Sequence, residues 1–316
     1  ALLDDHPSGS NRALPPAHGQ GRRLSGELRR DPLSGRFVII APERARRPGA
    51  KRPALEPPTE EELGACPFCA GREEQTPPET FALADQPREA NTPGWQVRVV
   101  PNLFPAFERQ EVVVHVPRHA RSLAELGEEE LGRVALAWRE RAEAARSEGF
   151  TYVHAFVNEG REAGASLPHS HSQLVWLREP PPAVAAEAGG ECGLCEVLRD
   201  AETYQVASRG GLVLLAAPAG RLPYELLLAP AEHAGEGAFE SELLPGALGL
   251  LAEAIRRLHA AEGAVPVNAW VHDGAHWHIE IVPRLSVLAS IELGAGIYVN
   301  TVPPEQAAAT LREVAG

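Results

Sequence analysis

The sequence lacks any apolar run close to the ~20 residues that a membrane-spanning helix requires. Its N-terminal stretch, ALLDDHPSGSNRALPPAHGQGRRLSGELRR, also lacks the apolar segment of a secretion signal. We therefore expect a cytoplasmic protein that has no membrane partner. Residues 1–25 are rich in Gly, Pro, Ser and Arg and show no hydrophobic period, so we predict a disordered tail there.

Positive charge is in short supply, with 30 Lys and Arg against 43 Asp and Glu and a net charge of −13. A chain this acidic repels nucleic-acid phosphates, which argues against a nucleic-acid partner. The one dense basic stretch, ERARRPGAKR at residues 43–52, is by itself equally typical of a solvated loop and of a binding segment. The length of 316 residues suffices for one large core or two domains.

Cysteine is scarce, and the 4 cysteines form two Cys-x-x-Cys pairs, Cys66 with Cys69 and Cys192 with Cys195. In a cytosolic chain, pairs at this spacing favour metal ligation over disulfides. A redox pair is the alternative. Thioredoxin-like sites place a single such motif at a strand-to-helix junction in a small domain, so two copies favour metal.

Hydrophobic patterns predict a series of strands, each bounded by turn signals. In the first half they cover residues 37–41, 95–102, 111–117, 152–160 and 172–177, and in the second half 212–218, 224–230, 267–274 and 277–283. A long helix is predicted from Ser122 onward, because Leu126, Leu131, Val134, Leu136 and Trp138 have helical spacing. Ser122 and Glu125 fit a capping box at its start. A second helix is predicted within residues 242–263.

The two halves repeat the same order of unusual residues. Each half has a Cys-x-x-Cys pair, strands, a histidine, a helix and then His-x-His, and Asn158-Glu-Gly matches His272-Asp-Gly. We therefore predict an α+β fold made by tandem duplication, with antiparallel sheets and helices packed on them. The predicted domains cover residues 26–180 and 190–316, packed as a pseudo-dimer with a Pro-rich seam at 178–190.

Each half also offers a complete zinc-ligand set, since zinc prefers four tetrahedral thiolate and imidazole ligands. The predicted sets are Cys66, Cys69, His119 and His169 in the first half, and Cys192, Cys195, His233 and His276 in the second. A site closed by four protein ligands leaves no position for substrate. We therefore expect both metals to stabilise the fold.

The stretch GASLPHSHSQ, residues 164–173, contains the candidate reacting group. If His169 binds metal, His171 lies on the same side of an extended chain two residues later. An imidazole is a good nucleophile toward phosphorus. Supporting groups surround it: Gly160 and Gly164 permit close backbone approach to a phosphate, and the potential phosphate donors are Asn158, Ser166 and Gln173. The alternative is a histidine that only packs in a loop.

Together these residues form the pattern N-x-G-x3-G-x-S-x2-H-x-H-x-Q at 158–173, which resembles the active-site signature of the galactose-1-phosphate uridylyltransferase family. That family is a branch of the histidine-triad superfamily. The resemblance also covers DPLSGRFVIIAPERARRP, CPFCAGREEQTPPE, WQVRVVPNLFPAF, VPRHARSLAEL and ELGAGIYVNTVPPE. It thus extends over nearly the whole chain outside the predicted tail.

The resemblance implies a UDP-glucose–hexose-1-phosphate uridylyltransferase of galactose metabolism with ping-pong chemistry. UDP-glucose would give uridylyl-His171 and glucose 1-phosphate, and galactose 1-phosphate would then accept the uridylyl group. Gln173 would stabilise the intermediate, and His169 would be a zinc ligand. Ser166 would belong to the catalytic group with His171 and Gln173 as a phosphate contact. The implied substrate contacts are Arg44, Arg47, Asn102, Asn158 and Gly164, with Glu292 supplied by the neighbouring subunit of a homodimer.

Other interpretations remain open. Triad hydrolases carry a histidine where this chain has Gln173, and a neutral amide cannot shuttle protons to water, so transfer is favoured over hydrolysis. Ser170 between the two histidines, together with the second Cys pair, resembles a branch that includes ADP-glucose phosphorylases, and Ser290-Ile291 departs from the family's Gly-aromatic pair. A non-catalytic zinc-stapled nucleotide-binding protein is the third reading. His278 as a second nucleophile is disfavoured, because Glu280 would repel phosphate.

Overall fold

The computed structural model describes residues 26–46, 52–54, 56–187, 189, 191–233 and 235–314. The predicted tail at residues 1–25 and the predicted substrate contact Arg47 lie outside these ranges. No helix in the described part of the chain is both long and apolar enough to cross a membrane.

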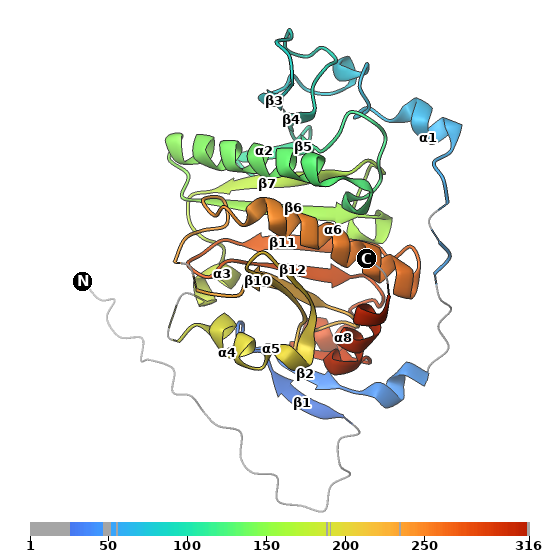
Figure 1. Cartoon of the computed structure of the whole chain (residues 1–316), viewed down its shortest axis with the longest axis vertical. Helices are drawn as coiled ribbons and strands as arrows, with labels where there is room; N and C mark the ends of the chain where they lie inside the picture. The colour runs from blue at the N-terminus through green and yellow to red at the C-terminus, as the bar shows by residue number, and fades with distance from the viewer. Residues whose placement is uncertain are drawn as a thin grey trace, which may run out of the picture.

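The centre of the molecule is a ten-stranded antiparallel sheet with the strand order β3-β4-β5-β7-β6-β11-β12-β10-β9-β8 (Figure 1). In this order the strands are Phe81–Leu83, Val97–Pro101, Arg109–Val114, His171–Leu177, Tyr152–Glu159, Val267–His272, His278–Pro283, Leu226–Pro230, Leu212–Ala216 and Gln205–Arg209. Every strand predicted within these segments is confirmed. The short edge strands β3 and β8 were not predicted, because they lack a long apolar run.

The two halves of the sequence meet in the middle of this sheet, where β6 pairs with β11 and Phe156 lies opposite Trp270. Outward from that pair, the strand order β6-β7-β5-β4-β3 has its counterpart in β11-β12-β10-β9-β8. The halves therefore share one continuous sheet, and equivalent strands occupy equivalent places in it.

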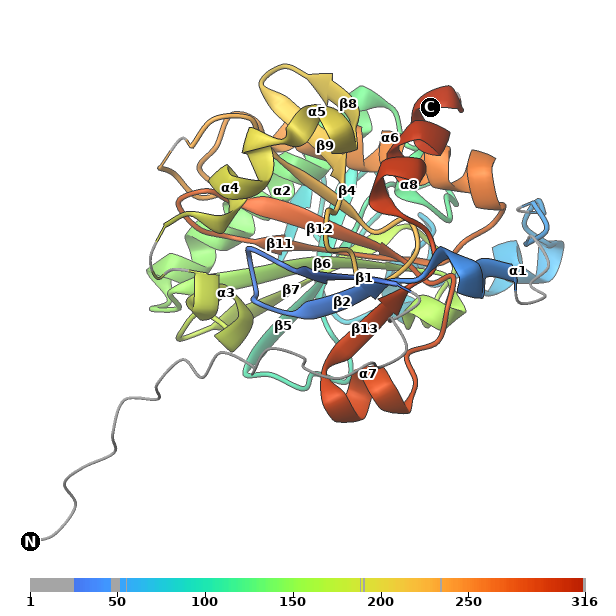
Figure 2. The ribbon, with the colours of Figure 1, turned by 90° about the horizontal axis from the view of Figure 1, so that it is seen from below.

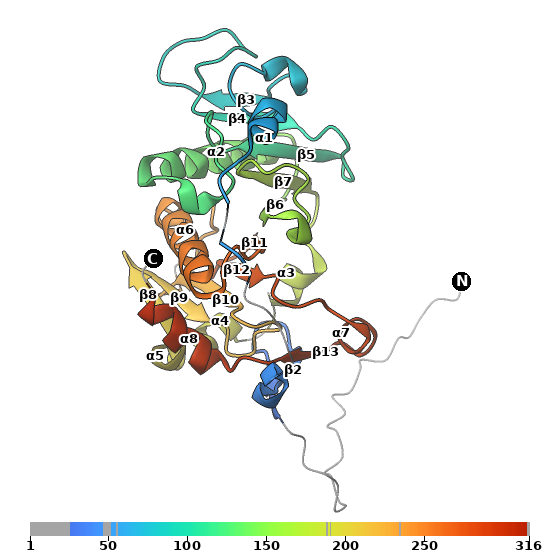
Figure 3. The same ribbon diagram turned by 90° about the vertical axis from the view of Figure 1, so that its right-hand side faces the viewer.

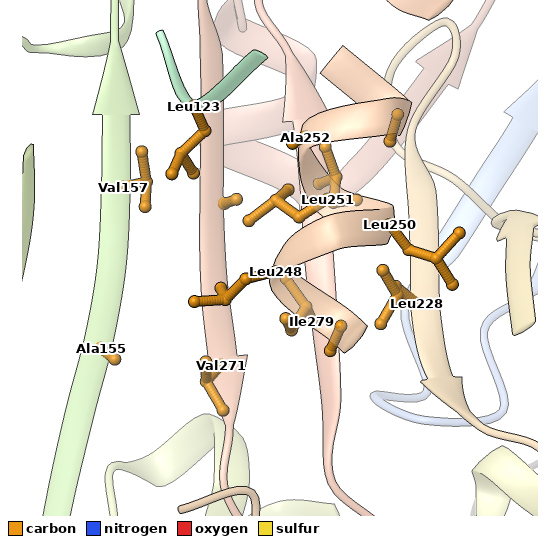
Figure 4. Close-up of a cluster of buried hydrophobic side chains, with 14 of the residues drawn as sticks. Leu123, Ala155, Val157, Leu228, Leu248, Leu250, Leu251, Ala252, Val271 and Ile279 are labelled. Carbon is orange, nitrogen blue, oxygen red and sulfur yellow. The ribbon is translucent and has the colours of Figure 1, made fainter. Parts of the chain in front are cut away.

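Two long helices, α2 (Glu128–Ser147) and α6 (Leu244–Glu262), pack against one face of the sheet and against each other (Figures 1 and 3). The main core lies between these helices and the strands. Figure 4 shows Leu248 and Leu251 of α6 beside Val271 and Ile279 of the sheet. Burial of each such side chain stabilises the fold by about 1.5–3 kcal/mol.

The first long helix begins later than predicted, because a short 3-10 turn precedes it. The capping box of Ser122 and Glu125 forms, but it caps a 3-10 turn, η3 (Leu123–Glu125), and the α-helix begins only after Gly127. Leu126 adopts an extended backbone between the two, which brings its side chain into the core. Leu136, one of the residues whose helical spacing indicated the helix, is 42% exposed on α2.

A second sheet of three strands joins the two ends of the described chain. Its strands are β1 (Glu27–Arg30), β2 (Phe37–Ile40) and β13 (Ile297–Asn300), and β13 runs parallel to β2 (Figure 2). Asn300 attaches this sheet to the second half by donating to the carbonyl oxygens of Gly220 and Leu222 at 2.9 and 3.1 Å. Of these strands, only β2 was predicted.

The remaining helices are short, and all of them except α8, which follows the last strand, lie in the connections between strands. The α-helices are α1 (Glu60–Ala65), α3 (Pro182–Glu187), α4 (Gly193–Arg199), α5 (Ala201–Tyr204), α7 (Ser290–Ala295) and α8 (Pro304–Glu313), and the 3-10 turns are η1 (Pro42–Arg46), η2 (Glu73–Gln75) and η4 (Arg161–Ala163). The fold is therefore of the α+β class, with antiparallel pairing throughout the large sheet.

Candidate active site

His171 is the first residue of β7, and its proton position is determined by the backbone beside it. Its Nδ1 lies 2.6 Å from the carbonyl oxygen of His169. A carbonyl oxygen only accepts, so Nδ1 carries the hydrogen and Nε2 keeps its lone pair. The side chain is buried, which lowers the pKa of His171 and keeps the ring neutral. The Phe68 ring packs edge-on against it, with 5.5 Å between ring centroids. The Nε2 atom is thus suited to nucleophilic attack.

Gln173 follows on the same side of β7, and its amide is held in one orientation. Its Oε1 accepts from Gln110 Nε2 at 2.8 Å and from Asn102 Nδ2 at 3.2 Å. Because both neighbours donate to the oxygen, the Nε2 hydrogens of Gln173 remain available to an acceptor such as a phosphoryl oxygen. The sequence predicted Asn102 and Gln173 as site residues but missed Gln110.

Asn158, at the end of β6, is oriented in the same way. Asn268 Nδ2 donates to Asn158 Oδ1 at 2.8 Å and to the carbonyl oxygen of Ala163 at 2.7 Å. The Asn158 Nδ2 group is therefore left to donate, and it lies on the side of Gly164. Gly164 has φ +92°, a left-handed conformation that other residues rarely adopt, and it is exposed.

The loop after β6 borders a cavity of about 360 Å³, which Asn158 also lines. Asn158, Ser166 and the buried Glu159 are among its lining residues, and Ser166 is exposed in the loop. Glu159 accepts from the Ser122 hydroxyl at 2.6 Å and from the backbone N–H of Leu123 at 2.7 Å. Burial raises the pKa of Glu159 to about 7.

The first predicted metal-ligand set comes together directly before β7, the strand that begins at His171. The ligand atoms of Cys66, Cys69, His119 and His169 all lie within 4.8 Å of one another. His169 Nδ1 is 3.3 Å from Cys66 Sγ, and His119 Nδ1 is 3.5 Å from Cys69 Sγ. On its other side, His169 Nε2 donates to the Val116 carbonyl oxygen at 3.0 Å. A hydrogen bond from the second ring nitrogen orients a metal-binding histidine, so this donor set fits a metal ion.

The second predicted set has the same geometry in the second half. Cys192, Cys195, His233 and His276 also have their ligand atoms within 4.8 Å of one another. His276 Nδ1 is 3.4 Å from both sulfurs, and His276 Nε2 donates to the Pro230 carbonyl oxygen at 3.1 Å. The accepting carbonyl oxygens occupy similar places, because Pro230 is the last residue of β10 and Val116 lies just after β5. The hydrogen bond that orients His169 is therefore repeated at His276.

A third group of potential ligands surrounds His278, and sequence reasoning missed it as a group. Glu187, His272, His278 and Glu280 offer ligand atoms within 4.8 Å of one another. Glu187 lies in α3, in the connection between the two halves. That connection is not part of the repeat, so nothing in the sequence indicated that Glu187 lies near these histidines. His278 is buried and its Nε2 has no hydrogen-bond partner among the described residues. Glu280 pairs with Arg221, and with Arg36, the residue before β2, at 3.9 Å.

Two predicted substrate contacts lie on short helices outside the large sheet. Arg44 is exposed on η1, and its backbone N–H donates to Ala41. Glu292 lies in α7, where its carboxylate accepts from the backbone N–H of Ala289 at 2.9 Å. Within the described ranges, neither side chain forms a hydrogen bond with His171, Gln173 or Asn158.

A neutral imidazole with a free Nε2, flanked by two oriented amide donors on an antiparallel α+β scaffold, is suited to nucleotidyl transfer through a covalent histidine. The fold and this arrangement define a nucleotidyltransferase of the histidine-triad superfamily.

Comparison with known proteins agrees with this class. The family model for the N-terminal domain of galactose-1-phosphate uridyl transferase matches residues 104–181. ADP-glucose phosphorylase from Arabidopsis thaliana is 30% identical over 92% of this chain and 93% of its own. Galactose-1-phosphate uridylyltransferase from Thermotoga maritima is 26% identical over 91% of this chain and 98% of its own. The chain belongs to the galactose-1-phosphate uridyl transferase family, within its ADP-glucose phosphorylase-like branch.

Solved structures give the same result. The crystal structure of the Arabidopsis ADP-glucose phosphorylase with bound ADP-glucose has a TM-score of 0.78 at 29% identity, covering 92% of this chain and all 100% of that one. A structure of uridylyltransferase has a TM-score of 0.65 at 25% identity, covering 90% of this chain and 97% of that one. The resemblance inferred from the sequence motifs is thereby confirmed.

Proposed function

We propose that this enzyme transfers an adenylyl group from ADP-glucose to inorganic phosphate by way of a covalent adenylyl-His171. The uridylyl reading of the sequence motifs is now the second candidate, because the relative at 30% identity and the structure at TM-score 0.78 are both ADP-glucose phosphorylases. The observation that carries the proposal is the hydrogen bond from His171 Nδ1–H to the His169 carbonyl oxygen, which leaves Nε2 for attack.

In the first step, Nε2 of His171 attacks the α-phosphorus of ADP-glucose. A P–N bond forms, the bond from the α-phosphorus to the bridging oxygen breaks, and glucose 1-phosphate leaves. The imidazole becomes positively charged, and the His169 carbonyl oxygen stabilises the retained Nδ1–H. Gln173 and Asn158 donate to the nonbridging oxygens of the phosphoryl group.

In the second step, an oxygen of inorganic phosphate attacks the adenylyl phosphorus, the P–N bond breaks, and ADP leaves with His171 neutral again. The acceptor oxygen is already ionised, so no proton has to be removed from it. This fits the amide at Gln173, which holds no transferable proton at neutral pH.

The test is a search for the covalent intermediate by intact-protein mass spectrometry after mixing with ADP-glucose or UDP-glucose. The proposal predicts a mass gain of one AMP from ADP-glucose, reversed by inorganic phosphate with release of ADP. A gain of one UMP alone would support the uridylyl candidate. His171→Ala abolishes the adduct, and imidazole rescues His171→Gly. His154→Ala, on the adjacent strand β6, serves as the matched control and keeps the adduct.

Nucleotide binding with no adduct from either sugar, in protein that contains its metal, would contradict both enzymatic candidates. That result would support the third hypothesis, a non-catalytic nucleotide-binding protein whose fold is stabilised by metal ions.

We also propose that both Cys2His2 groups bind zinc, for which this donor set is typical. Each group is closed by four protein ligands, so the ions would hold the fold and contribute no reacting group. The first ion would fix His169 and, through the next two residues, His171. The matching donor sets and strand orders support an origin of the two halves by tandem duplication.

We further infer a homodimer in which Glu292 reaches the hexose site of the partner subunit. The support is an exposed apolar group around Glu292, made of Val287, Ile291 and Leu293, which are 88%, 49% and 74% exposed. A second exposed apolar group, Leu103, Phe104 and Phe107, follows Asn102 beside the candidate site. Contact between such surfaces in two copies would remove both from water.

A further inference from the structure

The side of the nucleophile strand that faces the helices carries a hydrogen-bond network that the chemistry above does not use. Ser170 and Ser172 flank His171, and alternation along the strand directs their side chains away from its imidazole. His115, the residue after β5, is fully buried between the two hydroxyls. Its Nδ1 is 2.9 Å from Ser170 Oγ, and its Nε2 is 3.0 Å from Ser172 Oγ. A single side chain therefore bridges the residues on both sides of the nucleophile.

The network is anchored in the helix layer. Trp138 of α2 donates its Nε1–H, which can only donate, to Ser172 Oγ at 2.8 Å. Ser172 can then donate its own hydrogen to His115 Nε2, and His115 Nδ1–H can donate to Ser170. This arrangement requires neutral His115, and burial holds the pKa of His115 well below its ordinary value. Both ring nitrogens and both hydroxyls are then paired.

The network acts on the peptide unit that orients the nucleophile. The carbonyl oxygen of that unit belongs to His169 and accepts from His171 Nδ1, while its N–H belongs to Ser170 and donates to the Ala120 carbonyl oxygen. The backbone N–H of His115 also donates to the Ser170 carbonyl oxygen at 3.2 Å. With the side chains before and after His171 held by one ring, the backbone between them has little freedom to rotate.

We propose that His115 is a positioning residue for the nucleophile, acting through Ser170 and Ser172 to keep His171 Nε2 aimed at the substrate phosphorus. The proposal rests on the proposed function for its kinetic consequence. His115 lies on the opposite side of the strand from the imidazole of His171 and makes no contact with the predicted substrate groups. A fully satisfied buried polar network specifies one arrangement, where an apolar contact of the same volume permits several.

The kinetic test compares the rate constant of adduct formation at saturating nucleotide sugar with the dissociation constant for that sugar. His115→Phe keeps the ring volume and removes both hydrogen bonds, so the rate constant falls about 10- to 100-fold while the dissociation constant changes less than about twofold. His115→Gln keeps one donor and one acceptor and recovers most of the rate. In a Ser170→Ala/Ser172→Ala background, adding His115→Phe causes little further loss, because the partners are already absent.

The matched control is His154→Phe, which replaces a histidine of the neighbouring strand whose Nδ1 has no hydrogen-bond partner among the described residues. It leaves the rate constant unchanged. Thermal unfolding of each variant separates loss of fold from loss of positioning. If His115→Phe does not fold, the rate constants of His115→Gln and of Ser170→Ala/Ser172→Ala are compared instead. The positioning role predicts that the first is close to the wild type and that the second is reduced.

A second readout does not depend on activity. In protein with ¹⁵N-labelled histidine, the His171 ring gives a single Nδ1–H tautomer in the wild type and a mixture of tautomers in His115→Phe. If the wild type forms no adduct, the proposed function fails, and this spectrum still tests the positioning role. The role is overturned if His171 shows the same tautomer in both proteins, or if His115→Phe and His154→Phe lose the same amount of rate.

Discussion

Asn268 donates its side-chain amide to the side-chain oxygen of Asn158 at 2.8 Å, across the pair of strands that joins the two halves of the chain. The second half of the chain therefore decides which way the side-chain amide of Asn158, in the first half, points. The residue that matches Asn158 in the repeat is His272, so the two halves no longer present the same chemistry at this place.

Replacing Asn268 with Ala removes the donor that orients Asn158. Asn158 is then free to turn its oxygen toward the phosphate, where it repels instead of donating. We expect adduct formation to slow about 10-fold, measured by intact mass at short reaction times. Val282 lies opposite Asn268 on β12, and Val282→Ala serves as the control for loss of side-chain volume. Equal rates in Asn268→Ala and wild type would contradict the role of this contact.

Gln173→Glu exchanges an amide donor for a carboxylate of nearly identical shape. The charge repels the phosphoryl group and the donor is lost, so the rate of adduct formation falls at least 100-fold. In Gln173→Ala, which loses the donor without adding charge, the rate of adduct formation falls less. The measurement is stopped-flow or quenched-flow sampling at saturating nucleotide sugar. A Gln173→Glu variant as fast as Gln173→Ala would mean that this side chain does not face the phosphate.

Loss of the two proposed zinc ions has unequal consequences. Cys66→Ala removes the ion that holds His169, so both adduct formation and one equivalent of bound zinc are lost. Cys192→Ala loses the other equivalent and lowers the unfolding temperature. It retains adduct formation, because its ligand His276 precedes β12, and strands β6 and β11 lie between β12 and the β7 strand of His171. Metal content by mass spectrometry and thermal unfolding measure both effects. Retention of activity in metal-free Cys66→Ala would contradict the assignment.

Glu159 gives the fold a pH dependence with a defined sign. Its folded-state pKa of about 7 lies above the ordinary carboxyl value, so the folded state binds more protons than the unfolded state between about pH 4.5 and 7. Stability from this group falls as pH rises through that window. Glu159→Gln removes the decline, which we expect to be on the order of 1–3 kcal/mol between pH 5 and 8 by denaturant unfolding.

The control is Glu162→Gln, an exposed carboxyl on the loop after β6 that pairs with Arg52 at 3.0 Å. It retains the pH dependence of the wild type. If Glu159→Gln shows the same slope as wild type, the buried carboxyl is not the source.

The inferred dimer is tested by placing a charge in the exposed apolar group of α7. Leu293→Asp lowers the association constant, and light scattering with size-exclusion chromatography then detects monomer at concentrations where the wild type is dimeric. Adduct formation at His171 persists, since the nucleophile lies within one chain. Glu292→Gln leaves the assembly unchanged. A wild-type protein that is monomeric at all accessible concentrations would contradict the inference.

Local pattern was sufficient for much of the fold. The strands around His171 and His278 are apolar runs bounded by turn residues, and they form where expected. The first long helix was displaced because the capping signal at Ser122 is satisfied by a single 3-10 turn. Strands β1 and β13 were missed, because their stability comes from pairing with β2, which is distant in sequence from β13.

The candidate site divides in the same way. Motif spacing alone indicated the two Cys2His2 sets, His171 and Gln173, since their chemical types and order in the chain carry the signal. Gln110, His115 and Asn268 were missed, because each acts through a hydrogen bond to a residue remote in sequence. His115, for example, is 55 residues from Ser170, and Asn268 is 110 residues from Asn158.

Sequence alone therefore determined which groups are present: the proposed nucleophile His171, the amide of Gln173 in place of a third histidine, and two donor sets in a repeated order. Only the tertiary structure decided where the protons lie. His171 carries its hydrogen on Nδ1 because the His169 carbonyl oxygen is beside it, and Asn158 presents its amide because Asn268 takes its oxygen. Hydrogen bonding is directional and short in range, so tautomers and amide orientations depend on neighbours that only the folded chain brings into contact.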